Sequence, residues 1–180
     1  MQSMQQTLLR DRNAAANRTG MARLNAGYAL NVALVHQDAL TSQWAGQVRD
    51  LMAEVAGPEA VHCTEWKIGD LIEPKVYWEG VAALAHADVI VVSLCEAERL
   101  PPAFYLWVNL WLQERSNLPG ALVALVVRPE ESNAWVNETR RYLAAVASQG
   151  RLEFFLRECD QPGELIPDLR EDITHWAKAA

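Results

Sequence analysis

The chain has 180 residues, of which 51% are hydrophobic and 22% charged, and its formal net charge is −7. This composition excludes a disordered chain, and the length predicts one domain whose core needs no disulfide or metal. No apolar run reaches the ~18 residues of a membrane-spanning helix, so we expect no membrane contact. An acidic surface repels phosphate, so we expect no nucleic-acid partner either.

The cysteines indicate a reducing compartment. Cys63, Cys95 and Cys159 are odd in number and far apart, and they form no CxxC or Cys/His ligand pattern. A disulfide framework and a metal site are therefore not expected. The first residues also lack the apolar stretch of a signal peptide. Together these features predict a cytoplasmic protein.

The first 27 residues differ from the rest of the chain. They carry four arginines and one aspartate, a net charge of +3, so the remainder carries −10. We predict a flexible or partly helical basic N-terminal arm over residues 1–27 and a single α/β domain over residues 28–180. The arm is either a solvated tail, with Met21 an alternative start, or a segment that docks on an acidic surface.

From residue 28 onward, apolar strand-like runs alternate with helical patterns. Near-continuous runs of β-branched and aliphatic residues are typical of strands buried on both faces. The expected strands are residues 28–35, 61–66, 88–94, 120–127 and 152–156. The expected helices are residues 41–56, 72–87, 101–115 and 133–149, with a last one marked by Leu165, Leu169, Ile173 and Trp176.

This alternation predicts a three-layer, doubly wound α/β sandwich with a five-stranded parallel sheet. The expected strand order is 2-1-3-4-5, which is flavodoxin-like, with residues 29–35, 89–94 and 121–127 as central strands. In such sheets ligands bind at the carboxyl ends of the strands, where the order reverses. The segments after the first and third strands are therefore the expected site.

Five residues in these two segments are catalytic candidates: His36, Asp38, Ser93, Cys95 and Glu96. His36 and Cys95 could form a nucleophilic dyad, with Asp38 or Glu96 orienting the imidazole. Paired carboxylates could instead bind Mg²⁺ or act as acid and base. The remaining alternative is a solvated rim of acids and a small packing cysteine, and we assign no metal ligands.

Four further residues are candidates for ligand binding: Thr41, Ser42, Trp66 and Arg128. Thr41 and Ser42 stand at a helix N-terminus, where they could hold a phosphate or carboxylate, or simply cap the helix. Trp66 and Arg128 border the same edge of the predicted sheet. The turn after the first strand contains no glycine, so neither a Walker nor a Rossmann phosphate loop is present and we expect no cofactor.

At these positions the chain resembles receiver domains of response regulators in fold. That resemblance implies acids after the first strand, an aspartate phosphoacceptor ending the third, a hydroxyl after the fourth and a lysine after the fifth. Here Asp38 is the acid after the first strand, Ser93 stands at the phosphoacceptor position, Arg128 replaces the hydroxyl and Arg157 is the nearest base. Phosphotransfer is therefore not implied.

Residues 35–112 resemble TIR domains, in the turn 36–39, the helix with Trp44, the turn 68–70 and the strand 87–93. That resemblance implies an NAD-cleaving glutamate in the helix after the third strand, but residues 104–109 contain no acid. Flavodoxins share the predicted fold, yet no hydroxyl- and glycine-rich loop follows the first strand. The likeness to all three groups is one of fold, and it identifies no characterised family.

The predicted helix 101–115 is unusual because eight of the nine residues from 104 to 112 are apolar or aromatic. A helix that covers a sheet normally has one polar face. We therefore expect it to form an interface, most simply in a homodimer, unless neighbouring elements of the same chain cover it. The expected interface residues are Phe104, Trp107, Val108, Leu110 and Trp111.

Two functions remain open. The favoured one is a non-catalytic signalling or protein-interaction module that assembles through helix 101–115. The alternative is a small enzyme that hydrolyses nucleotides or acyl groups, either a TIR-like NAD hydrolase or a Cys/His hydrolase, in the crevice between the first and third strands.

Overall fold

The computed structural model describes residues 30–128, 134–163 and 168–179. Its sheet has five strands in the order β2-β1-β3-β4-β5, and all neighbouring strands are parallel. This is the predicted flavodoxin-like order, with β1, β3 and β4 in the centre. The strands are β1 (Leu30–His36), β2 (Val61–Lys67), β3 (Val89–Leu94), β4 (Gly120–Val127) and β5 (Leu152–Cys159).

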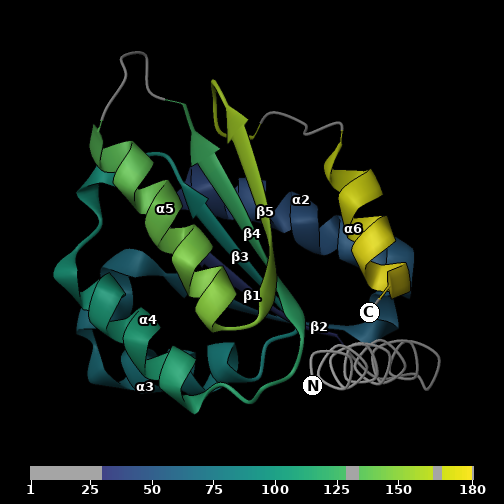
Figure 1. The fold of residues 1–180 in the computed structure, drawn as a ribbon, viewed down its shortest axis with the longest axis horizontal. Helices are drawn as coiled ribbons and strands as arrows, with labels where there is room; N and C mark the ends of the chain where they lie inside the picture. The colour runs from purple at the N-terminus through teal and green to yellow at the C-terminus, as the bar shows by residue number, and fades with distance from the viewer. Residues whose placement is uncertain (1–29, 129–133, 164–167, 180) are drawn as a thin grey trace, which may run out of the picture.

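Helices cover both faces of the sheet (Figure 1). They are α2 (Ala39–Ala56), α3 (Pro74–Ala85), α4 (Pro102–Glu114), α5 (Ala134–Gln149) and α6 (Leu169–Ala179). Three short 3₁₀ helices, η1 (Pro58–Ala60), η2 (Ile68–Ile72) and η3 (Ala97–Arg99), lie in the connections. Helices α3, α4 and α5 form one layer, and α2 and α6 form the other. Alternate residues of the buried strands therefore enter two separate cores, as Val35 and Leu34 do.

The element boundaries differ from the predicted ones by a few residues. Helix α2 begins at Ala39 rather than at residue 41, because Asp38 caps it. Strand β5 continues three residues further, to Cys159. The predicted arm over residues 1–27 and the helical position Leu165 lie outside the described residues. In the described part of the chain, none of the helices has the length and apolarity needed to cross a membrane.

Helix α4 corrects the predicted interface. Its large apolar side chains are buried in the chain's own core rather than on its surface, with 0–2% of each exposed: Phe104, Trp107, Val108 and Trp111. They pack against the sheet and the adjoining helices α3 and α5. Leu110 is half-buried, and only Leu106 is largely exposed. The apolar pattern therefore reflects packing within one chain.

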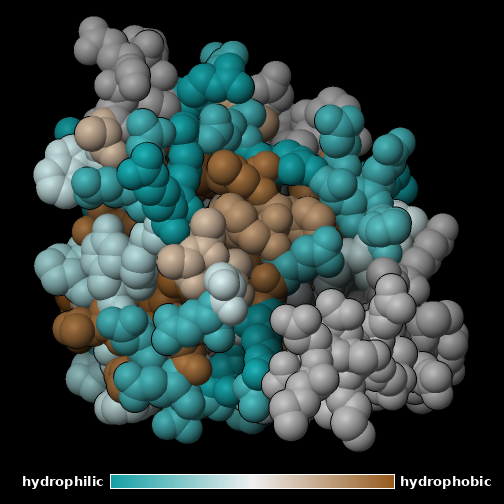
Figure 2. Space-filling model, in the orientation of Figure 1, coloured by the Kyte–Doolittle hydropathy of each residue, from teal (hydrophilic) through white to brown (hydrophobic). Residues whose placement is uncertain are grey.

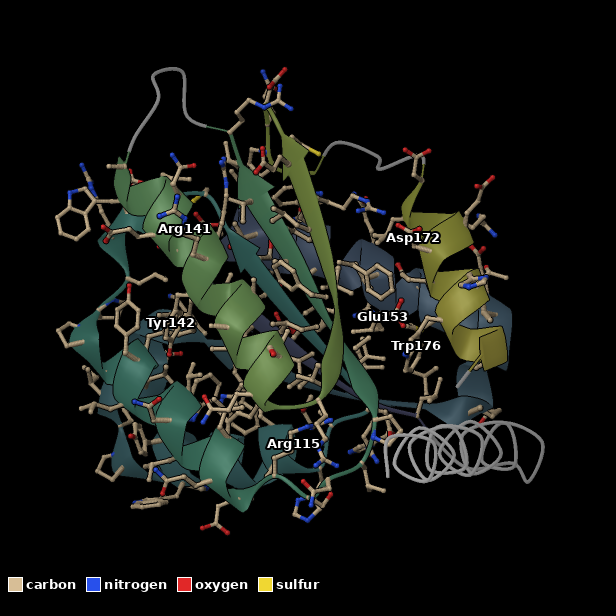
Figure 3. The ribbon with its side chains drawn as sticks, in the orientation of Figure 1. Arg115, Arg141, Tyr142, Glu153, Asp172 and Trp176 are labelled. Carbon is tan, nitrogen blue, oxygen red and sulfur yellow. The ribbon has the colours of Figure 1, made fainter. Side chains whose placement is uncertain are left out.

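Arg115 joins three connections at the end of the sheet where the strands begin (Figure 3). Its Nη1 donates to the carbonyl oxygens of Ala87, at 2.8 Å, and Leu84, at 3.3 Å. Its Nε donates to the Gly150 carbonyl at 3.1 Å, and its Nη2 lies 3.5 Å from that of Leu118. One guanidinium thus satisfies backbone acceptors after α3, after α4 and after α5.

Candidate functional site

The carboxyl ends of β1 and β3 lie side by side, as predicted. His36, the last residue of β1, is in register with Ser93 in β3. The two segments that follow these strands therefore meet at the point where the strand order reverses, which is the usual ligand site of this fold.

Gln37 bridges these two segments, and the sequence analysis did not single it out. Its Oε1 accepts hydrogen bonds from the backbone N–H groups of Cys95 and Glu96, both at 2.8 Å. Its Nε2 donates to the Glu96 carbonyl at 2.9 Å. An amide side chain supplies both a donor and an acceptor, so Gln37 satisfies the turn after β3 by itself. These three backbone groups are therefore already bonded.

Asp38 is the N-cap of α2, whereas Thr41 or Ser42 was the expected cap. The Asp38 Oδ1 accepts the Thr41 N–H at 2.8 Å. In return, the Thr41 Oγ1 accepts the backbone N–H groups of Gln37 and Asp38, at 3.0 and 2.9 Å. Thr41 is fully buried in this capping box. These bonds occupy N–H groups that an anion at the helix N-terminus would use.

Cys95 points at the same carboxylate. Its Sγ lies 3.1 Å from the Asp38 Oδ2. Burial, together with the nearby charge of Asp38, raises the pKa of the Cys95 thiol to about 11. The bond from the Thr41 N–H is the main cause that lowers the pKa of Asp38 below 3.8. At neutral pH the pair is therefore a thiol that donates to a carboxylate, and the thiolate needed for nucleophilic attack is scarce.

His36 does not form the expected dyad with Cys95. Its Nδ1 lies 3.0 Å from the Asp38 carbonyl oxygen, and its Nε2 lies 2.9 Å from the Glu65 Oε1. Both ring nitrogens are therefore committed to groups other than a nucleophile. Ser93 is fully buried in the sheet, and its Oγ has no hydrogen-bond partner among the described residues. The structure thus assembles neither a Cys–His nor a Ser–His nucleophile.

The other predicted residues lie around this centre without converging on one point. The Ser42 hydroxyl bonds to Glu65, and the Trp66 Nε1 donates to the Thr64 Oγ1 at 3.2 Å. Glu96 carries an exposed ion pair with Arg99 at 3.5 Å. Across the described ranges, no cluster of three or more His, Cys, Asp or Glu residues could hold a metal ion.

Arg128 lies farther along the edge of the sheet, where β4 ends. Its guanidinium pairs with Asp160 at 3.1 Å and lies 4.0 Å from a carboxylate oxygen of Glu158. Glu158 also pairs with Arg140 of α5 at 2.7 Å. Arg128 is therefore engaged with the carboxylates of β5 and the residues after it.

Comparison with known proteins reveals similarity in fold. No family model matches the chain, and no curated protein matches its sequence. An oxidoreductase from Corynebacterium diphtheriae aligns with a TM-score of 0.56 at 15% identity, over 83% of this chain and 94% of that one. The two-electron reduced flavodoxin of Megasphaera elsdenii gives 0.55 at 12%, over 82% and 99%.

A flavodoxin from Streptococcus pneumoniae TIGR4 gives a TM-score of 0.53 at 14% identity, over 82% of this chain and 95% of that one. All three alignments span most of both chains at low identity. The chain therefore has a flavodoxin-like fold, and its family is not assigned.

Proposed function

We propose that this chain is a flavodoxin-like interaction module that works without flavin and acts through its surface. The observation that supports this most strongly is that Gln37 and Asp38 bond to backbone and thiol groups at the ends of β1 and β3.

The residues at this crevice do not fit a flavin nucleotide. In flavodoxin, FMN occupies the point where the strand order reverses between β1 and β3. A phosphate there needs free N–H groups at a helix N-terminus. In this chain the Asp38 carboxylate already accepts the Thr41 N–H, and its negative charge opposes a second anion. Gln37 occupies the N–H groups of Cys95 and Glu96, so these two donors in the turn after β3 are not free for a phosphate.

The same geometry gives little support to hydrolysis. Cys95 is a protonated thiol at neutral pH, and His36 contacts Asp38 and Glu65 instead of it. A glutamate that could cleave NAD is also missing from residues 104–109, in α4. Contact through the surface is the function that we propose instead. Large apolar side chains are exposed at Leu40, Ile72, Trp78, Leu106, Leu118 and Trp135.

Titration of the purified full chain with FMN tests this proposal. We expect no saturable quenching of flavin fluorescence up to about 100 µM, a concentration at which a site with micromolar Kd would be full. We also expect no consumption of NAD. A flavodoxin titrated in parallel is the positive control. Saturable FMN binding, or NAD turnover that Glu96→Gln abolishes, overturns the proposal.

A further inference from the structure

Strand β5 is an outer strand of the sheet, and no described strand pairs with its free edge. Figure 1 looks onto this edge, with β5 nearest the viewer and α5 and α6 on either side. Over the middle of β5, Figure 2 shows apolar surface ringed by hydrophilic side chains. Phe154, Phe155 and Leu156 are half-buried there. The strand has eight residues and contains no Pro or Lys, although it carries the charged residues Glu153, Arg157 and Glu158.

The backbone of β5 defines which groups face the open edge. The Cys159 carbonyl accepts the Arg128 N–H at 2.7 Å and therefore points toward β4. Backbone groups alternate in direction along a strand, so Phe154 and Leu156 direct their N–H and C=O groups outward. The Leu156 carbonyl confirms this direction, since the Arg157 Nη1 of the same chain bonds to it at 2.8 Å from outside the sheet.

The sequence of β5 is complementary to itself when two copies run antiparallel about Phe155. Phe154 of one copy then lies opposite Leu156 of the other, and their outward backbone groups form a hydrogen-bonded pair. Phe155 lies opposite Phe155 of the partner subunit, and Glu153 lies opposite the partner's Arg157. We propose that the free edge of β5 binds β5 of a second copy in this register, forming a two-fold dimer with one continuous sheet.

Charge supports this register. Glu153 and Arg157 are on the same face of β5, toward α6, and Figure 3 shows Glu153 between β5 and α6. In the proposed pairing each Glu153 faces an arginine at a position where side chains are close, because the pair is not hydrogen-bonded. A shift of the pairing centre to residue 154 would instead place Arg157 opposite the partner's Arg151. The opposite shift would place Arg157 opposite an apolar Phe155.

Arg157 already has partners that the dimer must accommodate. It forms an ion pair with Asp172 of α6 and donates to the Leu156 carbonyl. Its buried Nε has no hydrogen-bond partner in the described part of the chain. On pairing, the Leu156 carbonyl takes the N–H of the partner's Phe154, and Arg157 lies between Asp172 and the partner's Glu153. This inference does not depend on whether the crevice between β1 and β3 binds a ligand.

Sedimentation velocity of the full chain over a range of concentrations tests the dimer. We expect a dimer at micromolar concentration, and dissociation with Glu153→Arg, which places an arginine opposite the partner's Arg157 on both sides of the two-fold axis. The dissociation constant should rise about a hundredfold. Trp78→Arg is the matched control, because it places the same charge at an exposed site on α3, far from β5 in the chain, and should leave the dimer intact. Circular dichroism checks that both variants remain folded.

Oxidative cross-linking tests the register. Phe155→Cys faces its own copy across the two-fold axis, at a Cα separation suited to a disulfide. Glu153→Cys is four residues along the strand from its copy, about 13 Å away, and should not cross-link. A wild type that stays monomeric at every concentration overturns the proposal. Dimers that survive Glu153→Arg, or cross-linking at 153 but not 155, also overturn it.

Discussion

The indole nitrogen of Trp107 in α4 donates a hydrogen bond to the backbone carbonyl of Tyr77 in α3, 3.0 Å away. This bond ties the two helices together at a point where the indole ring lies directly over Gly80. A fully buried Trp with its N–H satisfied belongs to the core, so the aromatic run of α4 stabilises the fold itself.

Gly80→Ala should destabilise the protein. A Cβ atom at residue 80 would lie 2.7 Å from the Trp107 Cζ2, and the buried ring has little room to move. We expect a net loss of about 1–3 kcal/mol of unfolding free energy, because overpacking exceeds the helix propensity that alanine adds. Urea denaturation measures it. Gly46→Ala in α2 is the control, because its Cβ would meet only the end of the Arg49 side chain, at 3.4 Å, so stability should hold or rise.

Cys95 should react slowly with iodoacetamide. Its pKa of about 11, against an ordinary value of 9.0, reduces the thiolate fraction about a hundredfold at neutral pH. Alkylation, followed by mass spectrometry of the Cys95 peptide, should speed up with pH until the solution approaches pH 11. Asp38→Asn should accelerate the reaction, since it removes the charge that opposes the thiolate. Rapid labelling of Cys95 in the wild type at pH 7 would contradict this picture.

Asp38 should stabilise the fold in a pH-dependent way. Its folded pKa lies below 3.8, so its contribution is present above pH 3.8 and is lost as the pH falls through the folded pKa. Asp38→Ala should cost about 1 kcal/mol at pH 7, and its difference from the wild type should narrow in acid. Asp38→Asn keeps a capping oxygen, so its unfolding free energy at pH 7 should lie between those of the wild type and Asp38→Ala. If the difference in unfolding free energy between the wild type and Asp38→Ala stays the same at low pH, the carboxylate charge contributes nothing to stability.

Gln37→Ala should loosen the turn after β3. It leaves the part-buried N–H group of Cys95 and the exposed one of Glu96 without their acceptor, which costs about 1 kcal/mol of unfolding free energy. Hydrogen exchange at these two amides should accelerate more than in the centre of β3. Gln47→Ala removes an exposed bond to the Gly163 carbonyl and is the control, with an effect below about 0.5 kcal/mol. If Gln37→Ala and Gln47→Ala lower the unfolding free energy equally, the Gln37 bonds to the turn after β3 do not stabilise the protein.

The fold could be predicted because its central strands are buried on both faces. The apolar runs at residues 89–94 and 120–127 have one stable environment, the interior of a parallel sheet between two helical layers. Their alternation with helices then left few possible strand orders.

The apolar pattern of α4 was misleading for a related reason. A helix beside α3 and α5 can bury its large aromatic side chains among them, and the pattern of a single helix does not reveal its neighbours.

The site was less predictable because its contacts are long-range. The bond from Gln37 to Cys95 joins residues 58 positions apart in the sequence, and a lone glutamine has no motif that would identify its partners. The strand order alone predicts that four of the candidate residues lie near one another: His36, Asp38, Ser93 and Cys95. Which of them bond to each other depends on side-chain directions: His36 turns to Glu65, and Asp38 turns to Thr41 and Cys95.

Arg115 links parts of the chain that are far apart in sequence, and this affects how the molecule opens. The carbonyls of Ala87, Leu118 and Gly150 belong to three different connections, yet they share one guanidinium. If one connection departs, a partly buried cation loses an acceptor, which weakens its hold on the other two. We therefore expect the ends of α3, α4 and α5 to open as one cooperative unit rather than to fray one at a time.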